Sequence, residues 1–175
     1  MRILVTGSKG FIGKNLVFKL YENDIEVLHF NRGDNIANIV ELLSKADLII
    51  HLAGENRPRN ISDYDTVNAE LTASICNAIR ASDSKIPLVL VSSIQANLDN
   101  PYGKSKLAAE IKVEALANQT GTPVHIYRLP GVFGKWCKPN YNSVVATFCH
   151  NIANEIPVRI DDGSNNLKLV YIDDV

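Results

Sequence analysis

The fold of this chain is decided by RILVTGSKGFIG, residues 2–13. The apolar run Ile3–Val5 is typical of a strand buried on both faces of a parallel sheet, and apolar residues recur at helical spacing from Phe11 to Tyr21. Gly7, Gly10 and Gly13 lie at and after the turn between them. A strand, a glycine turn and a helix in this order predict a dinucleotide site, because the diphosphate can approach the glycine main chain and the N–H groups at the helix start.

The rest of the chain alternates buried strands with helical segments. This order predicts an α/β fold with a doubly wound parallel sheet (a Rossmann fold), which binds ligands outside the carboxyl ends of its strands. In the helix expected over 102–118, the core candidates are Leu107, Ile111, Val113 and Leu116. The further strands are expected over 25–30, 46–52, 87–91 and 124–129, and the further helices over 36–43 and 64–81, with loops over 31–34 and 55–63.

Composition excludes several classes of function. The 175 residues suffice for one domain with a sizeable core, and 18 Lys+Arg against 19 Asp+Glu leave no electrostatic case for binding nucleic acid or an anionic membrane. No apolar run is long enough to cross a membrane, and a strand at the N-terminus leaves no room for a signal peptide. Cys76, Cys137 and Cys149 form neither a disulfide framework nor a zinc site, so a reducing cytoplasm is expected.

The end of the second strand indicates the cofactor. NAD sites of this fold tend to place an acid there for the ribose 2′-hydroxyl, whereas this chain has Asn31-Arg32. A guanidinium pairs well with a 2′-phosphate, and Lys9 in the glycine turn adds a second positive charge. The residues therefore favour NADPH over NADH, with Asp34 as a rival ligand for the ribose.

Tyr102 and Lys106 stand four residues apart and so share one helix face. A phenol has a reference pKa of about 10, and a nearby ammonium together with an oxidised nicotinamide favours the phenolate. Lys106 can also hold the nicotinamide ribose. A hydroxyl of Ser92 or Ser93, at the end of the preceding strand, is expected to bind the substrate carbonyl beside the tyrosine.

Beyond Pro130 the alternation stops. We expect a loop over 131–141, a helix over 142–152 and short strands over 158–160 and 167–172, with a further helix expected to begin at 173–175, where the sequence stops. The expected domains are an NADP-binding Rossmann domain over 1–130 and the start of a truncated substrate-binding region over 131–175. His29, His51, His125 and His150 show no spacing for metal ligands, so no metal site is expected and they are read as core or surface residues.

The motifs at residues 6–13, 51–54, 92–93, 101–106 and 128–130 resemble those of the extended short-chain dehydrogenases/reductases in order and spacing. The resemblance implies that Ser93, Tyr102 and Lys106 are catalytic, that Leu52–Gly54 border the adenine and pyrophosphate, and that Asn68 lies near the active site. Gly131 stands where such enzymes often carry an asparagine that helps hold the diphosphate. The cofactor-binding residues expected overall are Gly7, Lys9, Gly10, Phe11, Ile12, Gly13, Asn31, Arg32, Leu52, Ala53, Gly54, Asn68, Tyr102, Lys106 and Arg128.

Residues 51–58, 92–96 with 99–103, and 133–148 resemble the bacterial capsular-polysaccharide reductases of the CapF type more specifically. That resemblance implies NADPH-dependent reduction of the C4 keto group of a UDP-linked 4-keto-6-deoxy N-acetylhexosamine, on the way to N-acetyl-L-fucosamine. A homodimer is expected. The family's C-terminal metal-binding cupin has no counterpart here. The expected substrate residues are Ser93, Gln95, Lys135, Asn142 and Ser143.

Two other enzyme classes and one non-catalytic class fit parts of the pattern. A 4,6-dehydratase with bound NAD places an Asp-Glu pair after the strand-end hydroxyl, where this chain has Ile94-Gln95. A 4-epimerase with bound NAD often has an acid at the tip of the second strand, which Asn31-Arg32 does not supply. A non-catalytic dinucleotide-binding domain has no reason to keep the serine, tyrosine and lysine together.

Overall fold

The computed structural model describes residues 1–58, 60, 64–82, 85–160, 163–164 and 166–175, without the side chains of 65–67. Part of the loop expected over 55–63 therefore lies outside the described residues. The chain divides into two compact units, Met1–Arg128 and Leu129–Val175. The first unit holds the central sheet, as the sequence predicts.

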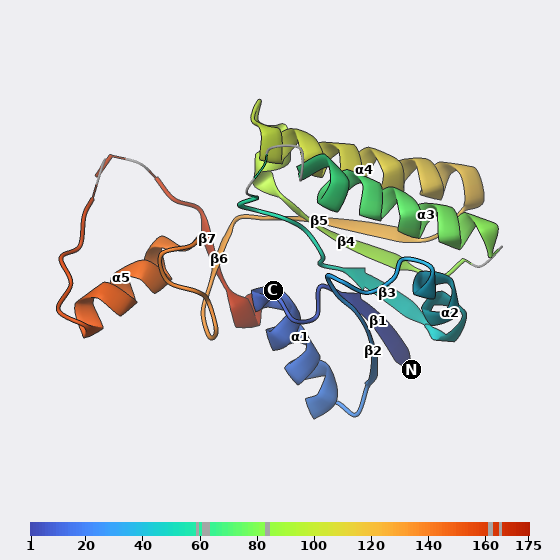
Figure 1. Ribbon diagram of the computed structural model, residues 1–175, viewed down its shortest axis with the longest axis horizontal. Coiled ribbons are helices and arrows are strands. Elements are labelled where there is room, and N and C mark those ends of the chain that lie inside the picture. The colour runs from blue at the N-terminus through green and yellow to red at the C-terminus, as the bar shows by residue number, and fades with distance from the viewer. Residues whose placement is uncertain (59, 61–63, 83–84, 161–162, 165) are drawn as a thin grey trace. The chain divides into compact units, whose positions relative to one another are not determined.

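Five strands form this sheet in the order β2-β1-β3-β4-β5 (Figure 1). Pairing is parallel, with Thr6 of β1 opposite both Phe30 of β2 and His51 of β3, so these strands end at the same edge. The chain passes from β1 to β2 on one side and then to β3 on the other. A ligand binds where the strand order reverses in this way, here beyond the end of β1. The strands are β1 (Arg2–Thr6), β2 (Glu26–Phe30), β3 (Leu48–His51), β4 (Leu88–Ser93) and β5 (Val124–Leu129).

Helices cover the two faces of the sheet. Leu4 of β1 packs with the buried residues of α2, α3 and α4, whereas its neighbours Ile3 and Val5 pack with α1. This alternation is what a strand between two helical layers requires, and Figure 1 shows α3 and α4 side by side. The helices are α1 (Phe11–Glu22), α2 (Asn38–Lys45), α3 (Leu71–Ala81) and α4 (Pro101–Thr120), with a π-helical segment η1 (Asp65–Glu70) before α3 and a 3-10 turn η2 (Ile94–Asn97) after β4.

Helix α4 buries a different set of side chains from the set that the sequence predicts. Its ends follow sequence rules: the Asn100 side chain accepts a hydrogen bond from the Gly103 N–H at 2.8 Å, and Gly121 ends it with φ 71°. Val113 and Leu116 are buried as expected, but Leu107 is 38% exposed and Ile111 56% exposed, so that part of the expectation is wrong. The inward stripe runs through Ser105, Lys106, Ala109 and Glu110, which leaves the two apolar residues on the outer face.

The second unit contains strand pairing that the sequence did not indicate. Strand β6 (Gly131–Phe133) lies within the expected loop and pairs in parallel with β7 (Leu169–Tyr171). A Cβ on Gly131 would come 2.9 Å from the Leu169 side chain, so glycine allows the close approach. The strand expected over 158–160 does not form, and Val158 and Ile160 are exposed. Helix α5 (Val144–Ala153) and the 3-10 turn η3 (Ile172–Asp174) complete the unit.

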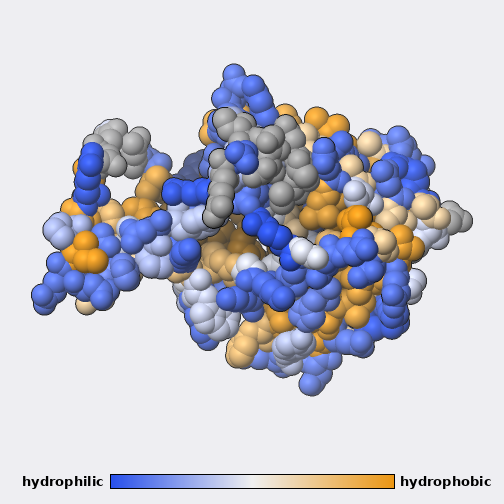
Figure 2. All heavy atoms as spheres, in the orientation of Figure 1, coloured by the Kyte–Doolittle hydropathy of each residue, from blue (hydrophilic) through white to orange (hydrophobic). Residues whose placement is uncertain are grey.

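The surface in Figure 2 mixes apolar and polar patches. Among the described residues, no helix combines the length and apolar character needed to cross a membrane. The same part of the chain contains no group of three or more His, Cys, Asp or Glu side chains placed to hold a metal ion.

Candidate functional site

The glycine turn after β1 is packed so tightly that side chains do not fit. Gly7 has φ +71°, and a Cβ there would lie 2.8 Å from the Ala53 main chain, which follows β3. A Cβ on Gly13 would lie 2.2 Å from the Gly7 carbonyl oxygen. The first and third glycines are thus required by backbone conformation and by close contact between the turn and α1.

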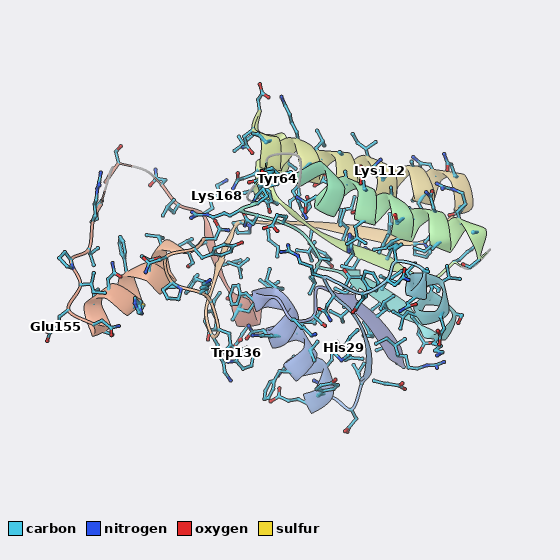
Figure 3. All side chains as sticks on the ribbon, in the orientation of Figure 1. His29, Tyr64, Lys112, Trp136, Glu155 and Lys168 are labelled. Atoms are coloured by element: carbon cyan, nitrogen blue, oxygen red, sulfur yellow. The ribbon has the colours of Figure 1, made fainter. Side chains whose placement is uncertain are left out.

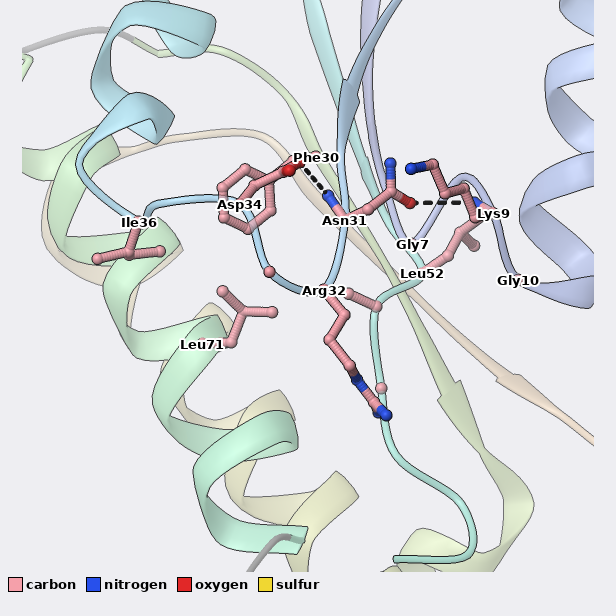
Figure 4. Close-up of a pocket in the computed structure, with 13 residues that line it drawn as sticks. Gly7, Lys9, Gly10, Phe30, Asn31, Arg32, Asp34, Ile36, Leu52 and Leu71 are labelled. Atoms are coloured by element: carbon pink, nitrogen blue, oxygen red, sulfur yellow. Dashed lines mark hydrogen bonds between the residues drawn. The ribbon is translucent and has the colours of Figure 1, made fainter.

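Asn31 anchors the turn to the end of β2. Its buried side-chain Oδ1 accepts a hydrogen bond from the Lys9 N–H at 3.0 Å (Figure 4). The same oxygen accepts one from the Ser8 hydroxyl at 3.1 Å. Its own N–H donates to the Asp34 carboxylate at 2.7 Å. The Asn31 amide, expected to contact the cofactor, is thus bonded to the glycine turn within the protein.

A pocket of about 490 Å³ opens beyond these strand ends. Helix α1 begins beside it at Gly10, with no side-chain cap and no acid in its first turn, so its N–H groups remain suited to an anion. The glycines, the uncapped helix start and the apolar walls fit a dinucleotide. Phe11, Ile12 and Gly13 form the first turn of α1 and do not line the pocket. The expected cofactor residues that do line it are Gly7, Lys9, Gly10, Asn31, Arg32, Leu52, Ala53 and Gly54.

Arg32 forms an ion pair that the sequence did not predict. Figure 4 shows its side chain extending from the end of β2 along the segment that follows β3. There its guanidinium donates a hydrogen bond to the Glu55 carboxylate. The Arg32 side chain is 77% exposed and that of Glu55 only 12%, so the acid is the more fixed member of the pair. No local pattern joins residues 23 positions apart, which is why Glu55 was missed.

Asn68 ties Glu55 to the helix that carries Tyr102 and Lys106. Its Oδ1 accepts from the Glu55 N–H at 2.8 Å, and its Nδ2 donates to the Glu55 carbonyl at 3.0 Å and to the Ser105 hydroxyl at 2.9 Å. Both amide hydrogens of Asn68 are therefore used within the protein. Asn68, expected near the cofactor, links the pocket to α4.

His51, at the end of β3, is a neutral core residue. The Thr72 hydroxyl uses its hydrogen to donate to the Asn68 carbonyl at 2.6 Å. Its oxygen must therefore be the acceptor for the Nε2–H of His51, at 2.9 Å. His51 Nδ1 is then the acceptor for the Thr6 hydroxyl at 2.6 Å. Burial and the charge of Lys106 lower the pKa of His51 to about 3, in keeping with this neutral form.

Ser93 and Tyr102 come together, as the sequence predicts for a carbonyl-binding pair. The Ser93 side chain lies near enough to the Tyr102 phenol to lower its pKa, and the Gln95 N–H donates to Ser93 Oγ at 3.2 Å. The buried hydroxyl of Ser92 has no hydrogen-bond partner in the described part of the chain. A second tyrosine, Tyr64 (Figure 3), packs its ring 5.8 Å from that of Tyr102.

Burial raises the pKa of the Tyr102 phenol above its ordinary value, the Ser93 side chain opposes this, and Tyr64 adds to it. The sequence led us to expect that Lys106 favours the phenolate, but Lys106 is not among the causes of this shift. The Lys106 ammonium instead donates to the Val91 carbonyl at 2.7 Å. The Tyr102 phenol therefore keeps its proton at neutral pH.

Arg128 is occupied within the first unit. Its Nε–H is shared between the two oxygens of the buried Glu110 carboxylate, and its NH2 group also donates to that carboxylate, at 2.6–3.1 Å. Its NH1 group donates to Asn97 Oδ1 at 2.6 Å. These bonds join β5 to α4 and η2. Glu110 raises the pKa of Arg128 further. A cofactor contact by Arg128 stays a prediction.

Three of the expected substrate residues belong to the second unit. The Lys135 ammonium lies 4.4 Å from the centroid of the Trp136 ring. Ser143 caps α5, because its hydroxyl accepts from the Ala146 N–H at 3.3 Å, and Asn142 beside it is exposed. Gln95 lies in the first unit, next to Ser93. Substrate binding by these residues stays a prediction.

Comparison with known proteins agrees with this geometry. The model of the NAD dependent epimerase/dehydratase family matches residues 3–175. The chain is 51% identical over 176 residues to the UDP-2-acetamido-2,6-beta-L-arabino-hexul-4-ose reductase of Pseudomonas aeruginosa, a match that covers 100% of this chain and 47% of that protein.

Comparison with solved structures also finds proteins of the same fold. The capsular polysaccharide assembling protein CapF from Staphylococcus aureus matches with a TM-score of 0.87 and 42% identity, over 99% of this chain and 47% of that one. The UDP-glucose 4-epimerase of Thermotoga maritima matches with a TM-score of 0.88 over 99% of this chain and 70% of its own, but at 23% identity it shares the fold alone. The chain thus spans about half the length of the Pseudomonas and Staphylococcus proteins.

Proposed function

Because the chain belongs to the NAD dependent epimerase/dehydratase family, we propose that it is the cofactor-binding part of an NADPH-dependent reductase. The substrate we propose is a UDP-linked 4-keto-6-deoxy N-acetylhexosamine, reduced at C4 in the synthesis of a capsular or surface polysaccharide precursor. The 51% identity to a UDP-sugar reductase and the 42% identity to a capsule protein support this choice.

The observation that carries the proposal is that Tyr102 lies near Ser93 and shares helix α4 with Lys106, which is held against β4 at Val91. Reduction of a ketone requires a proton for the oxygen, and a neutral phenol is the form that can donate one. Burial raises the pKa of Tyr102, so the proton is present at neutral pH before substrate binds.

In the proposed reaction the keto carbon would take up a hydride, which a bound reduced nicotinamide would supply. The Ser93 hydroxyl, oriented by the Gln95 N–H, donates a hydrogen bond to the keto oxygen and holds it beside Tyr102. The Tyr102 O–H bond then breaks, and its proton goes to the same oxygen, which becomes the product hydroxyl. The phenolate that remains then takes up a proton from solvent, and we propose that Lys106, whose ammonium donates to Val91 in the structure, supports the phenolate until then.

The cofactor choice rests on Arg32 and Lys9, which line the pocket and carry positive charge suited to a 2′-phosphate. We place the enzyme in the cytoplasm, where NADPH and UDP-sugars are available.

We also propose a homodimer, supported by Leu107 and Ile111, which expose an apolar face of α4 at i and i+4. Sedimentation of the complete protein tests the dimer: a monomer at micromolar concentration contradicts it.

The experiment that tests the function is Tyr102→Phe in the complete protein, followed by nicotinamide absorbance with a UDP-linked 4-keto sugar. We expect kcat to fall by about 100-fold or more, since a positioned general acid contributes about that much. NADPH binding should persist, because Phe keeps the ring. Tyr127→Phe on β5, whose ring is 55% exposed, is the matched control. Full activity in Tyr102→Phe contradicts the mechanism.

A further inference from the structure

We propose that Glu55 is a specificity-determining residue, which weakens the preference for NADPH over NADH by holding the Arg32 guanidinium. The inference rests on the proposed function in taking Arg32 as the ligand for a 2′-phosphate. It concerns a residue that the sequence patterns did not single out. Its starting point is the ion pair between the loop after β2 and the segment after β3.

The Glu55 carboxylate is held independently of Arg32. Its Oε1 accepts main-chain N–H hydrogen bonds from Asn56 at 3.1 Å and from Arg57 at 3.3 Å, while Oε2 accepts from the Arg32 guanidinium. The main chain of Glu55 is bonded on both sides to Asn68. Because these partners remain when Arg32 moves, the negative charge stays at this position.

A 2′-phosphate that binds Arg32 therefore meets a fixed carboxylate as well. The phosphate carries up to two negative charges, so it competes with Glu55 for the guanidinium and is repelled by it. The ribose 2′-hydroxyl of NADH carries no charge, and a hydroxyl can donate to a carboxylate. Glu55 consequently disfavours NADPH and does not disfavour NADH.

The acidic residue of this site comes from a different part of the chain than the acid that usually contacts the ribose in this fold. An acid that reads the ribose typically stands at the tip of the second strand, and this chain has Arg32 near that point. Glu55 brings a carboxylate to Arg32 from beyond β3 instead. Since the pair has one largely exposed member, we expect the effect of Glu55 on NADPH affinity to be modest, about three- to tenfold.

The test is a fluorescence titration of this chain with NADPH and, in parallel, with NADH at one ionic strength. Glu55→Gln removes the charge and keeps an acceptor for the Asn56 and Arg57 N–H groups. We expect this variant to bind NADPH about three- to tenfold more tightly, with NADH unchanged or weaker. In an Arg32→Ala background the same substitution should have little effect. The matched control is Glu22→Gln, which removes the carboxylate of an exposed ion pair between Glu22 and Lys19.

The outcomes separate this inference from the proposed function. Wild-type chain that binds neither cofactor, or that prefers NADH, overturns both. If the wild-type chain prefers NADPH through Arg32 but Glu55→Gln does not increase the affinity for NADPH, the inference alone is overturned. Weaker NADPH binding in Glu55→Gln also overturns it, since Glu55 would then orient Arg32 productively.

Circular dichroism checks that each variant is folded. If Glu55→Gln fails this check, Glu55→Asp replaces it, because the shorter side chain withdraws the charge from Arg32 and should give a smaller gain for NADPH. No gain for NADPH in a folded Glu55→Asp also overturns the inference.

Discussion

The Lys106 ammonium donates a hydrogen bond to the main-chain carbonyl of Val91 at 2.7 Å, from a side chain on a residue that is only 7% exposed. Val91 lies in β4, two positions before Ser93. This contact fixes α4 against the strand that ends at Ser93. Burial lowers the pKa of Lys106 to about 8, while the charge of Glu110 acts in the opposite direction.

Lys106 should make stability depend on pH. The pKa falls from 10.5 in the unfolded reference to about 8 in the folded chain, so between these values the unfolded state binds more protons. The free energy of unfolding contributed by Lys106 therefore increases as pH rises from about 8 to 10.5, and the cost of the buried charge is fully present below pH 8. Urea unfolding at pH 7 and at pH 10 should show this gain in wild type and less of it in Lys106→Met.

Lys104→Met is the control for this measurement, because Lys104 lies on the same helix but is 69% exposed and pairs with Asp99. It should keep the pH dependence of wild type. An equal pH dependence in Lys106→Met and wild type contradicts the buried-charge interpretation.

Arg32→Ala should weaken NADPH binding by about tenfold or more and leave NADH binding nearly unchanged, since a charge-assisted bond to a 2′-phosphate is lost. Parallel titrations of the chain measure the ratio of the two dissociation constants. Arg80→Ala removes an equal charge on α3, where Arg80 bonds to Asn77 and Gln119. A similar loss for both cofactors indicates that Arg32 does not read the 2′-position.

Gly13→Ala should destabilise the first unit and abolish dinucleotide binding. Its Cβ would lie 2.2 Å from the Gly7 carbonyl oxygen and 2.8 Å from the Ser8 Cα, and both are main-chain atoms that cannot move aside cheaply. We expect a thermal midpoint several degrees lower. Gly163→Ala, where an added Cβ meets nothing within 4 Å, should behave like wild type. Normal binding by Gly13→Ala means that the turn can widen.

Arg128→Gln tests whether this residue holds the fold or the cofactor. Its removal leaves the Glu110 carboxylate, which is 1% exposed, without its cationic partner. We expect a thermal midpoint several degrees lower with little change in the dissociation constant for NADPH. The opposite result, unchanged stability with weaker NADPH binding, assigns Arg128 to the cofactor instead.

Local patterns explain why most of the first unit could be predicted. A strand between two helical layers needs the continuous apolar run of Ile3–Val5, and the tight turn after it needs Gly7 and Gly13. Both signals lie within a few residues of each other. The second unit was harder, because β6 and β7 are short and their pairing joins residues far apart in the sequence. Alternating apolar residues at 158–160 carry no information about whether a partner strand exists.

The sequence by itself determined the order of strands and helices, the glycine turn, and the common helix face of Tyr102 and Lys106, because each depends on spacing along the chain. The tertiary structure alone decided that Arg32 meets Glu55, that Lys106 is buried against β4, and that burial raises the pKa of Tyr102. These properties depend on burial and on charges brought together from distant positions. Both act through space, so no local pattern records them.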